Sequence, residues 1–275
     1  MVKNINRKEI YHGKVLFKEE EMRNRWEKCQ LEMEKEGIDV LILSKPSNIF
    51  YMSGYRTQLW DDDFRAMIAI LPRGGEPCLV LPGLEGPAGE KESWFPSVRR
   101  RGTGKTETED VPELVKRIFE ERKLLNTTVA IELGGFQKLG MNHDVFEEIK
   151  SSLLNCKFKS CGKVMWKIRP IKSKREIEFM RKAAQISSKG FTKLTEVIKA
   201  GTSEREIRKV MGRTFLDEGS DLDGGSYIAI STGPDRYDMT NPCPCDRNIE
   251  KGDQVLLDFG AQYNYYVSDL YRPHL

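Results

Sequence analysis

The chain has 275 residues, of which 39% are hydrophobic and 32% are charged, a composition typical of globular proteins. Lys and Arg total 45 against 42 Asp and Glu, and this near balance argues against a nucleic-acid or membrane-surface partner. No run of about 18 apolar residues is present, so we expect no membrane-spanning segment. The six cysteines follow no disulfide spacing, which favours a reducing compartment, the cytoplasm.

Alternating helix and strand patterns predict an α/β architecture with a mixed sheet for the first part of the chain, ending near residue 165. The predicted helices are 17–36, 46–54, 111–123 and 141–154, and the predicted strands are 38–44, 64–72, 77–83, 128–134 and, further along, 226–232. Three arginines at 99–101 are expected in a charged edge strand and loop. They do not form a phosphate loop, because Arg99 stands where that motif requires glycine.

The second part of the chain is expected to begin with two capped helices. Ser173 and Glu176 predict a capping box that opens a helix over 172–201, and Ser203 with Glu206 predicts another box for the helix that follows. Apolar residues at helical spacing predict the buried stripe of the first helix: Ile177, Met180, Ala184, Phe191, Leu194 and Ile198. Gly201 is expected to end that helix.

Two acids lie in the strand-like segment 255–275. It predicts a hairpin that turns at Tyr263 and Asn264, and the alternation of side chains brings Asp258 close to Asp269. Asp258 has leucine and phenylalanine neighbours, so we do not expect it on the surface. Two adjacent buried carboxylates repel each other, and a divalent cation would relieve both the repulsion and the desolvation. The alternative is a pair of hairpin acids that faces water.

Three further residues are candidates for contact with a substrate. Trp60 and Asp61 open the acidic stretch WDDDF at 60–64. The ordinary interpretation of this stretch is a solvated loop. The alternative is a negatively charged rim that receives a cationic or amine-bearing substrate, in the same subunit or across a dimer interface. Tyr237 lies in the turn-rich segment 233–241, which would line a substrate pocket. The sequence assigns no catalytic residue.

Three segments carry a resemblance to a known family: EKEGIDVLILSKPSNIFYMSGY (34–55), MWKIRPIKSKREIEFMRKAAQIS (165–187) and IEKGDQVLLDFGAQYNYYVSDLYR (249–272). The sequence resembles the creatinase / aminopeptidase P / prolidase family of Xaa-Pro peptidases, the pita-bread metallohydrolases. The third segment is the most specific, because it combines the Gly-Asp entry, D-F-G and Tyr-x-Ser-Asp at the family's spacing. The resemblance implies an α/β creatinase-like N-terminal domain at 1–165 and the first half of an α+β pita-bread domain at 166–275.

The resemblance also implies a chemistry. Such enzymes hold a pair of divalent metals (Mn, Co or Zn) between two Asp, one His and two Glu, and hydrolyse an amide or C–N bond of a small peptide or small amide. The two Asp correspond to Asp258 and Asp269, whereas the other three ligands are absent from this chain. His274 follows Asp269 too closely to replace the family's histidine. We therefore expect a truncated member with weak or absent metal binding and no activity alone, and a homodimer formed through the N-terminal domain.

The sequence departs from the family pattern, and two alternatives to a peptidase stay open: a small-molecule amidinohydrolase and a non-catalytic interaction protein. The segment before Gly252 lacks the histidine of the peptidase members, which favours an amidinohydrolase of the creatine or ectoine type. Tyr265 stands where the hairpin turn normally has glycine, at a cost of about 1–2 kcal/mol if the backbone there is left-handed. Tyr271-Arg272-Pro273 replaces the usual Thr-Arg-Thr. The other alternative is a non-catalytic dimerisation or interaction protein.

Overall fold

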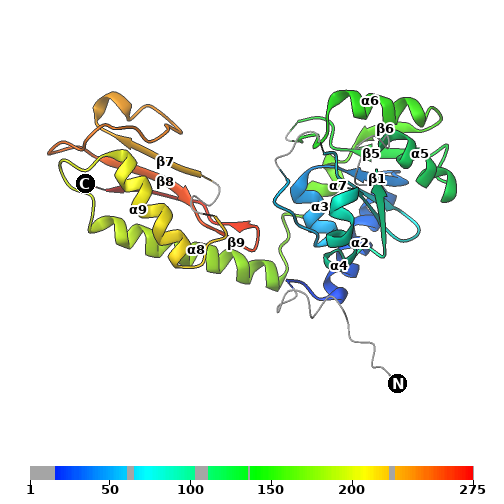
Figure 1. Ribbon diagram of the computed structural model, residues 1–275, viewed down its shortest axis with the longest axis horizontal. Helices are drawn as coiled ribbons and strands as arrows, with labels where there is room; N and C mark the ends of the chain where they lie inside the picture. The colour runs from blue at the N-terminus through cyan, green and yellow to red at the C-terminus, as the bar shows by residue number, and fades with distance from the viewer. Residues whose placement is uncertain (1–15, 61–64, 103–110, 136, 223–226, 275) are drawn as a thin grey trace, which may run out of the picture. The chain divides into compact units, whose positions relative to one another are not determined.

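A computed structural model describes residues 16–60, 65–102, 111–135, 137–222 and 227–274 (Figure 1). The chain divides into two compact units, unit 1 up to Ile171 and unit 2 from Lys172. The expected boundary at residue 165 lies inside helix α7 (Gly162–Ile168), so the division falls a few residues later. Within the described ranges, no helix has the length and hydropathy that crossing a membrane requires.

Unit 1 is built around a six-stranded mixed sheet. Its strands are β1 (Val40–Leu43), β2 (Ile68–Pro72), β3 (Cys78–Pro82), β4 (Ser97–Arg101), β5 (Thr128–Ile131) and β6 (Lys157–Ser160), in the order β4-β3-β2-β1-β5-β6. The β1–β2 and β2–β3 pairs are antiparallel, and the β3–β4, β1–β5 and β5–β6 pairs are parallel. Every residue of β1, β2 and β3 is buried, so the centre of the sheet is covered on both faces. The predicted mixed sheet and the arginine-rich edge strand are confirmed.

Helices pack on this sheet. They are α2 (Glu19–Lys35), α3 (Pro46–Ser53), α4 (Gly86–Glu92), α5 (Val111–Glu121), α6 (His143–Ser152) and α7, with a short 3₁₀ turn η1 (Gly83–Glu85). Val40 and Ile42 of β1 belong to one apolar core with Ile118 and Phe119 of α5 and Ile149 of α6. The sequence pattern does not predict α4, β6 or α7, because each is too short to display a hydrophobic period.

A buried carboxylate holds the beginning of α3. Glu132, just after β5, is 2% exposed. Its oxygens accept hydrogen bonds from the backbone N–H groups of Ser44 and Lys45, the Ser44 hydroxyl and the Asn48 side-chain amide, all at 2.9–3.1 Å. These donors surround a helix N-terminus, where N–H groups lack helical partners and the dipole favours negative charge. Burial raises the pKa of Glu132, and the hydrogen bonds from Asn48, Ser44 and Lys45 oppose that rise.

Unit 2 places two helices against a small antiparallel sheet. Its elements are α8 (Lys174–Thr195), α9 (Glu204–Asp217), β7 (Tyr227–Thr232), the 3₁₀ turn η2 (Pro234–Arg236), β8 (Val255–Gly260), β9 (Gln262–Tyr263), β10 (Tyr266–Val267) and β11 (Leu270–His274). The sheet has the order β11-β8-β7, and β9 pairs with β10 as a separate ribbon. The capping box of Ser173 and Glu176 is confirmed. The second box is half formed: the Ser203 hydroxyl accepts from the N–H of Glu206, without the reciprocal contact.

The buried face of α8 differs from the predicted stripe. Ile177 and Met180 are 44% and 37% exposed, and of the six predicted residues Leu194 is the one that is buried. The buried residues are Glu176, Phe179, Ala183, Ile186, Ser187, Gly190 and Leu194. Close packing on α9 explains the difference, because a Cβ atom on Gly190 would lie 2.7 Å from Met211 and from Phe215. The helix therefore turns Gly190 toward α9, and the stripe prediction is wrong for Ile177 and Met180.

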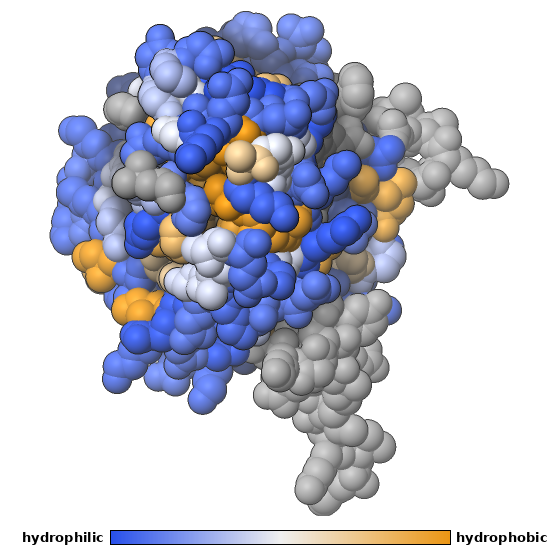
Figure 2. All heavy atoms as spheres, turned by 90° about the vertical axis from the view of Figure 1, so that its left-hand side faces the viewer, coloured by the Kyte–Doolittle hydropathy of each residue, from blue (hydrophilic) through white to orange (hydrophobic). Residues whose placement is uncertain are grey.

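Apolar side chains also remain on the surface of unit 2. The face drawn in Figure 2, the left-hand side of Figure 1, is mostly hydrophilic with a hydrophobic area near its centre. Large hydrophobic residues of unit 2 that are at least 36% exposed include Ile177, Met180, Leu216, Leu222, Tyr227, Met239, Val267 and Tyr271. They come from both helices and strands, so apolar exposure is not confined to one element.

Candidate functional site

Strand register brings Asp258 and Asp269 to the same face of the unit 2 sheet. β8 pairs with β11 so that Asp258 is opposite Tyr271, and the same register continues through the β9–β10 ribbon. It places Asp269, the residue before β11, opposite Gly260. Side chains two positions apart on a strand share a face, as do directly opposite residues. The two acids are therefore diagonal neighbours, as the alternation of side chains predicts.

A single tyrosine hydroxyl contacts both acids. β7 places Tyr227 opposite Gly260 on the other side of β8. Because glycine has no side chain, the tyrosine ring can reach across β8 toward Asp269. The Tyr227 Oη atom lies 2.6 Å from Oδ1 of Asp258 and 2.9 Å from Oδ1 of Asp269. The pKa of Tyr227 is raised: the largest cause is the hydrogen bond to Asp258, and partial burial and the hydrogen bond to Asp269 contribute less. The Tyr227 hydroxyl therefore keeps its proton at neutral pH.

The two carboxylates have more acceptor capacity than Tyr227 can satisfy. A hydroxyl carries one proton, and ionised carboxylates only accept hydrogen bonds. The Tyr227 proton must therefore be shared or alternate between Asp258 and Asp269. Hard carboxylate oxygens that converge on one point fit a divalent cation as part of its ligand shell. Among the described residues, no group of three or more His, Cys, Asp or Glu side chains is arranged for a metal, so this pair would be an incomplete shell.

The sequence leaves two possibilities for the two acids, a buried pair and a pair that faces water, and the observed burial lies between them. Asp258 is half-buried and Asp269 is exposed. Asp258 is therefore not fully on the surface, as expected, but it is not buried either, because only the alternate residues of β8, such as Leu257 and Phe259, face the apolar core with α8 and α9. Neither acid is simply a solvated hairpin residue, since both contact Tyr227.

The family model of the Creatinase/Prolidase N-terminal domain matches residues 25–171, more than half of the chain. The chain belongs to the creatinase/prolidase family. The model of metallopeptidase family M24 matches residues 178–273 of this family member. Its lineage is thus that of the M24 metallopeptidases, a family that depends on a pair of divalent metals.

Relatives and solved structures agree with this assignment. The Xaa-Pro dipeptidase of Pyrococcus furiosus is 28% identical over 251 residues, which cover 91% of this chain and 64% of that protein. The solved prolidase from Pyrococcus furiosus matches with a TM-score of 0.72 at 29% identity, over 90% of this chain and 69% of that one. A prolidase from Thermococcus sibiricus matches with a TM-score of 0.76 at 25% identity, over 92% and 65%. The fold expected from the resemblance, a creatinase-like α/β domain followed by part of a pita-bread domain, is confirmed.

The creatinase/prolidase chain spans less than two thirds of the curated relatives it matches. The shares are 64% for the Pyrococcus furiosus dipeptidase and 60% for the Pyrococcus horikoshii dipeptidase. The matches cover 91% and 87% of this chain, so both units take part in the similarity.

The candidate substrate residues near the beginning of this family member lie in unit 1. Trp60 is half-buried and packs edge-to-face on Tyr55, with ring centroids 5.7 Å apart. The Tyr55 hydroxyl donates to Glu85, so Trp60 rests on an anchored ring. Asp61 lies outside the described residues. The acidic rim proposed for this segment stays a prediction.

Tyr237 fastens the turn-rich segment to the beginning of β8. Its hydroxyl accepts a hydrogen bond from the backbone N–H of Gln254 at 2.7 Å. Asp258 lies further along β8, about 13 Å from Gln254 at a rise of about 3.3 Å per residue. The Tyr237 hydroxyl is therefore engaged at the opposite end of β8 from Tyr227, and a substrate role for it stays a prediction.

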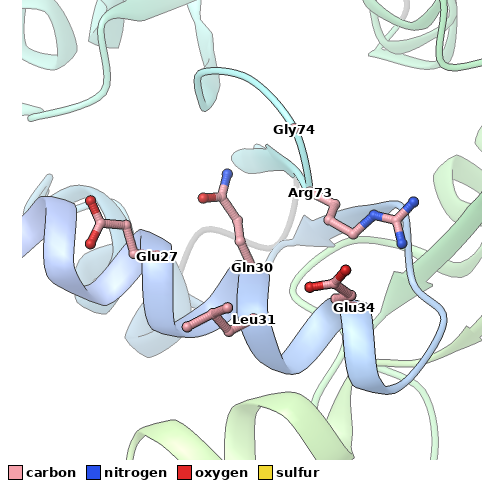
Figure 3. Close-up of a pocket in the computed structure, with 6 residues that line it drawn as sticks. All are labelled: Glu27, Gln30, Leu31, Glu34, Arg73 and Gly74. Atoms are coloured by element: carbon pink, nitrogen blue, oxygen red, sulfur yellow. The ribbon is translucent and has the colours of Figure 1, made fainter.

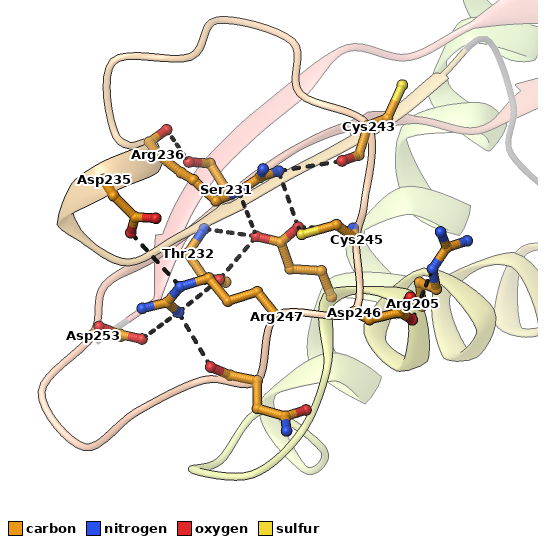
Figure 4. A network of polar contacts seen from close by, with 12 residues as sticks. Arg205, Ser231, Thr232, Asp235, Arg236, Cys243, Cys245, Asp246, Arg247 and Asp253 are labelled. Atoms are coloured by element: carbon orange, nitrogen blue, oxygen red, sulfur yellow. Dashed lines mark hydrogen bonds and ion pairs between the residues drawn. The ribbon is translucent and has the colours of Figure 1, made fainter.

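A second polar centre of unit 2 is a buried glutamate that sequence reasoning did not single out. Glu204, the first residue of α9, is 0% exposed. Its carboxylate accepts from the N–H and hydroxyl of Thr232 at 3.0 and 2.8 Å, from Arg236 Nε and Nη2 at 3.1 Å each, and from the N–H and thiol of Cys245 at 3.0 and 3.2 Å. Figure 4 shows Thr232, Arg236 and Cys245 directed to one carboxylate. This carboxylate joins α9 to the end of β7 and to the middle of the segment between β7 and β8.

Arg247 extends that network toward β8. Its Nη1 atom donates to the Thr232 hydroxyl at 3.1 Å and to Asp253 Oδ2 at 2.6 Å, as Figure 4 also shows. Gly233, with φ of +80°, lies directly beneath the guanidinium, where a Cβ atom would be 2.1 Å from Nη2. The pairing with Asp253 raises the pKa of Arg247 and lowers that of Asp253. The polar side chains of this segment thus bond to one another within the protein. They are not oriented to bind a ligand.

A groove on unit 1 offers no comparable chemistry. It lies between α2 and the β2–β3 turn and is lined by Glu27, Gln30, Leu31, Glu34, Arg73 and Gly74 (Figure 3). Gln30 already donates to the carbonyls of Pro72 and Gly75 at 2.9 and 3.3 Å, and Arg73 pairs with Asp39. The groove therefore brings together no nucleophile, acid–base pair or metal-ligand set.

The hairpin turn of this family member consists of Asn264 and Tyr265, one residue beyond the predicted centre. Their φ angles are +50° and +66°, which is typical of a type I′ turn. A tyrosine in this left-handed region is strained, and the expected cost is about 1–2 kcal/mol.

We expect Tyr265→Gly to raise the free energy of unfolding of unit 2 by about 1 kcal/mol, because glycine adopts positive φ without strain but loses more entropy on folding. Urea unfolding followed by far-UV circular dichroism measures the change. Asn264→Gly is the matched control and should have a smaller effect, since asparagine tolerates this region. A less stable Tyr265→Gly variant would show that the tyrosine side chain contributes more than its backbone strain costs.

Proposed function

We propose that Asp258 and Asp269 are two ligands of the divalent-metal site of an Xaa-Pro-type metallopeptidase, and that this chain alone holds the metal weakly and does not turn over substrate. The observation that carries the proposal is the convergence of both carboxylates on the Tyr227 hydroxyl. Membership of the creatinase/prolidase family and the M24 match over residues 178–273 support it. Mn, Co and Zn are the candidate metals, because all three accept carboxylate oxygens.

Each residue of the site has a task in this proposal. Asp258 and Asp269 supply the carboxylates that hold the cation, and Tyr227 donates to them and limits how they rotate. Gly260 leaves the space through which the Tyr227 ring reaches Asp269. The bound metal would supply Lewis acidity, which lowers the pKa of water and polarises a carbonyl. Two carboxylates do not complete a paired site, which is the reason for expecting no turnover.

The decisive experiment is a Mn²⁺ titration followed by electron paramagnetic resonance. We expect the wild-type chain to bind Mn²⁺ with a dissociation constant on the order of 10⁻⁴–10⁻³ M, as for other weak carboxylate sites. Asp258→Asn should abolish this binding, whereas Asp217→Asn, which changes an exposed acid on α9, should leave it unchanged. Equal binding by wild type and Asp258→Asn would refute the site. Chelator-sensitive hydrolysis of a Gly-Pro dipeptide by the chain itself would refute the expected inactivity.

The substrate class is a second part of the proposal. Relatives whose names describe Xaa-Pro dipeptidases favour a short peptide with proline after the scissile bond. The alternative is a small amide or amidino compound such as creatine or ectoine, favoured by the absence of histidine between Gly233 and Gly252. Parallel measurements of the binding of a Gly-Pro dipeptide and of creatine to the chain in the presence of Mn²⁺ separate the two. Binding of creatine without binding of the dipeptide would overturn the peptidase proposal.

We also propose a homodimer formed through unit 1, and a location in the cytoplasm. Exposed apolar side chains on unit 1, such as Leu31 at 57% and Trp166 at 59%, are compatible with a partner surface. All six cysteines are free thiols, which agrees with a reducing compartment. If the chain is instead a non-catalytic interaction module, dimerisation should persist without any response to metal. Sedimentation equilibrium tests the dimer, and a monomer at all concentrations would count against both versions. The Mn²⁺ titration separates the two, because an interaction module should bind no Mn²⁺ at Asp258.

A further inference from the structure

A buried pair of hydroxyls joins α8 to the hairpin beside Asp269. The Ser187 and Ser268 hydroxyl oxygens are 2.8 Å apart, and the two residues are 0% and 7% exposed. The backbone N–H of Ala261 donates to both oxygens, at 2.9 Å to Ser187 and 3.1 Å to Ser268. The N–H of Ser268 donates to the Ala261 carbonyl at 3.0 Å. Helix α8, the end of β8 and the approach to β11 thus meet at one point.

The cluster lies at an interruption of the strand ladder. β8 ends at Gly260 and β9 begins at Gln262, so Ala261 belongs to neither strand. In a regular antiparallel pair the Ala261 N–H would donate to the backbone carbonyl of the opposite residue. Here it is directed to hydroxyl groups, one of which comes from the helix. A side chain of α8 therefore takes the place of a ladder bond at the residue pair next to Asp269.

We propose that Ser187 is a positioning residue that holds the Asp269 carboxylate against the Tyr227 hydroxyl. Neighbouring side chains in an extended segment point to opposite faces, so Ser268 faces α8 while Asp269 faces Tyr227. An anchor on Ser268 from the helix side consequently fixes the direction of Asp269 on the other side. The proposal rests on the proposed metal function, because its effect on affinity arises only if Asp269 is a ligand.

Hydrogen bonding, rather than filling of space, is the role that the structure gives to Ser187. It occupies the buried face of α8 beside Ile186, where an unpaired hydroxyl would be costly. Ser188, the next residue, is exposed, and its hydroxyl donates to the Ala184 carbonyl within the same helix. Ser188→Ala is therefore a matched control that removes a hydroxyl from α8 without touching the hairpin.

The direct test needs no metal. In a deuterated chain with protonated tyrosine and aspartate, nuclear Overhauser effects between the Tyr227 ring and the Asp269 β-protons report the contact. We expect them in wild type and Ser188→Ala, and a loss of at least about half of their intensity in Ser187→Ala. Ser187→Cys keeps a side chain of the same shape, with a slightly larger and more weakly hydrogen-bonding atom, and should show the same loss, so it also serves if the alanine variant does not fold. Unchanged intensities in a folded Ser187 variant would overturn the proposal.

Mn²⁺ titration separates this proposal from the metal assignment. The dissociation constant of the Asp258-dependent site should rise about 10-fold in Ser187→Ala and stay unchanged in Ser188→Ala, in line with other residues that orient a ligand. Loss of the Tyr227–Asp269 contact in a chain that binds no Mn²⁺ would support the positioning role and refute the metal site. Equal Mn²⁺ affinity in wild type and Ser187→Ala, together with unchanged Overhauser effects between Tyr227 and Asp269, would refute the positioning role and leave the metal site in place.

Discussion

Replacing Glu204 with alanine is expected to lower the free energy of unfolding of unit 2 by about 3–5 kcal/mol, the range for removing one partner of a buried ion pair. Arg236, whose side chain is 14% exposed, would lose its bidentate partner. The N–H groups of Thr232 and Cys245 would lose their acceptor as well, and buried donors without partners add to the cost. The segment between β7 and β8 should therefore detach from α9.

The measurement can be confined to unit 2. All four tryptophans of the chain, Trp26, Trp60, Trp94 and Trp166, lie in unit 1. Urea unfolding of Glu204→Ala should lower the midpoint of a far-UV circular dichroism transition and leave the tryptophan fluorescence transition in place. Glu206→Ala, an exposed acid in the same helical turn, should change the free energy of unfolding by less than about 0.5 kcal/mol. Equal effects of the two variants would mean that the buried carboxylate contributes no more than a surface one.

Replacing Glu132 with alanine should destabilise unit 1 by about 3 kcal/mol, through a related mechanism. The N–H groups of Ser44 and Lys45 and the amide of Asn48 would be left without their acceptor at the beginning of α3. Unsatisfied buried donors cost about 1–3 kcal/mol each before relaxation. Water that enters the site would lower the total, so the sum of these terms is an upper bound.

Tryptophan fluorescence reports this change directly, because unit 1 contains every tryptophan. The midpoint of its urea transition should fall in Glu132→Ala. Glu132→Gln should lie between wild type and alanine, since its amide keeps one acceptor oxygen but turns a second donor group toward the Ser44 N–H. Glu148→Ala, an exposed position on α6, is the control. A Glu132→Gln variant as stable as wild type would show that the site does not need a carboxylate.

The sequence predicts the strands and helices that have a clear hydrophobic pattern. The structure shows which elements that pattern does not predict. β1, β2, β3 and β5 are apolar runs with no competing interpretation. β6 has the sequence KFKS and the exposed pattern of an edge strand, so only its parallel pairing with β5 creates it. The stripe of α8 is misplaced for a different reason: hydrophobicity alone favours Ile177, whereas contact with α9 requires the small Gly190 at the interface.

The residues of the candidate site can likewise be divided into those that the sequence predicts and those that it does not. The approach of Asp258 and Asp269 is predictable, because hairpin register and side-chain alternation are local properties of one segment. Tyr227 is not, since it lies 31 residues before Asp258 in the chain and resembles any aromatic residue at a strand end. Glu204 and Glu132 are missed as well. Glu204 opens a helix, where an acid is ordinary at the surface, and Glu132 follows the last residue of β5. Only tertiary packing shows that these two are buried.

The unbroken register of the hairpin also constrains how the segment can change in length. The arms from Asp258 to the Asn264-Tyr265 turn, and from the turn to Asp269, each present alternate residues to opposite faces. Deletion or insertion of one residue in either arm would rotate the acid beyond it toward α8. Extra residues at the turn itself would leave both faces intact and add little loop entropy. Natural variants of this segment should therefore differ in length at the turn, while the two arms keep their lengths.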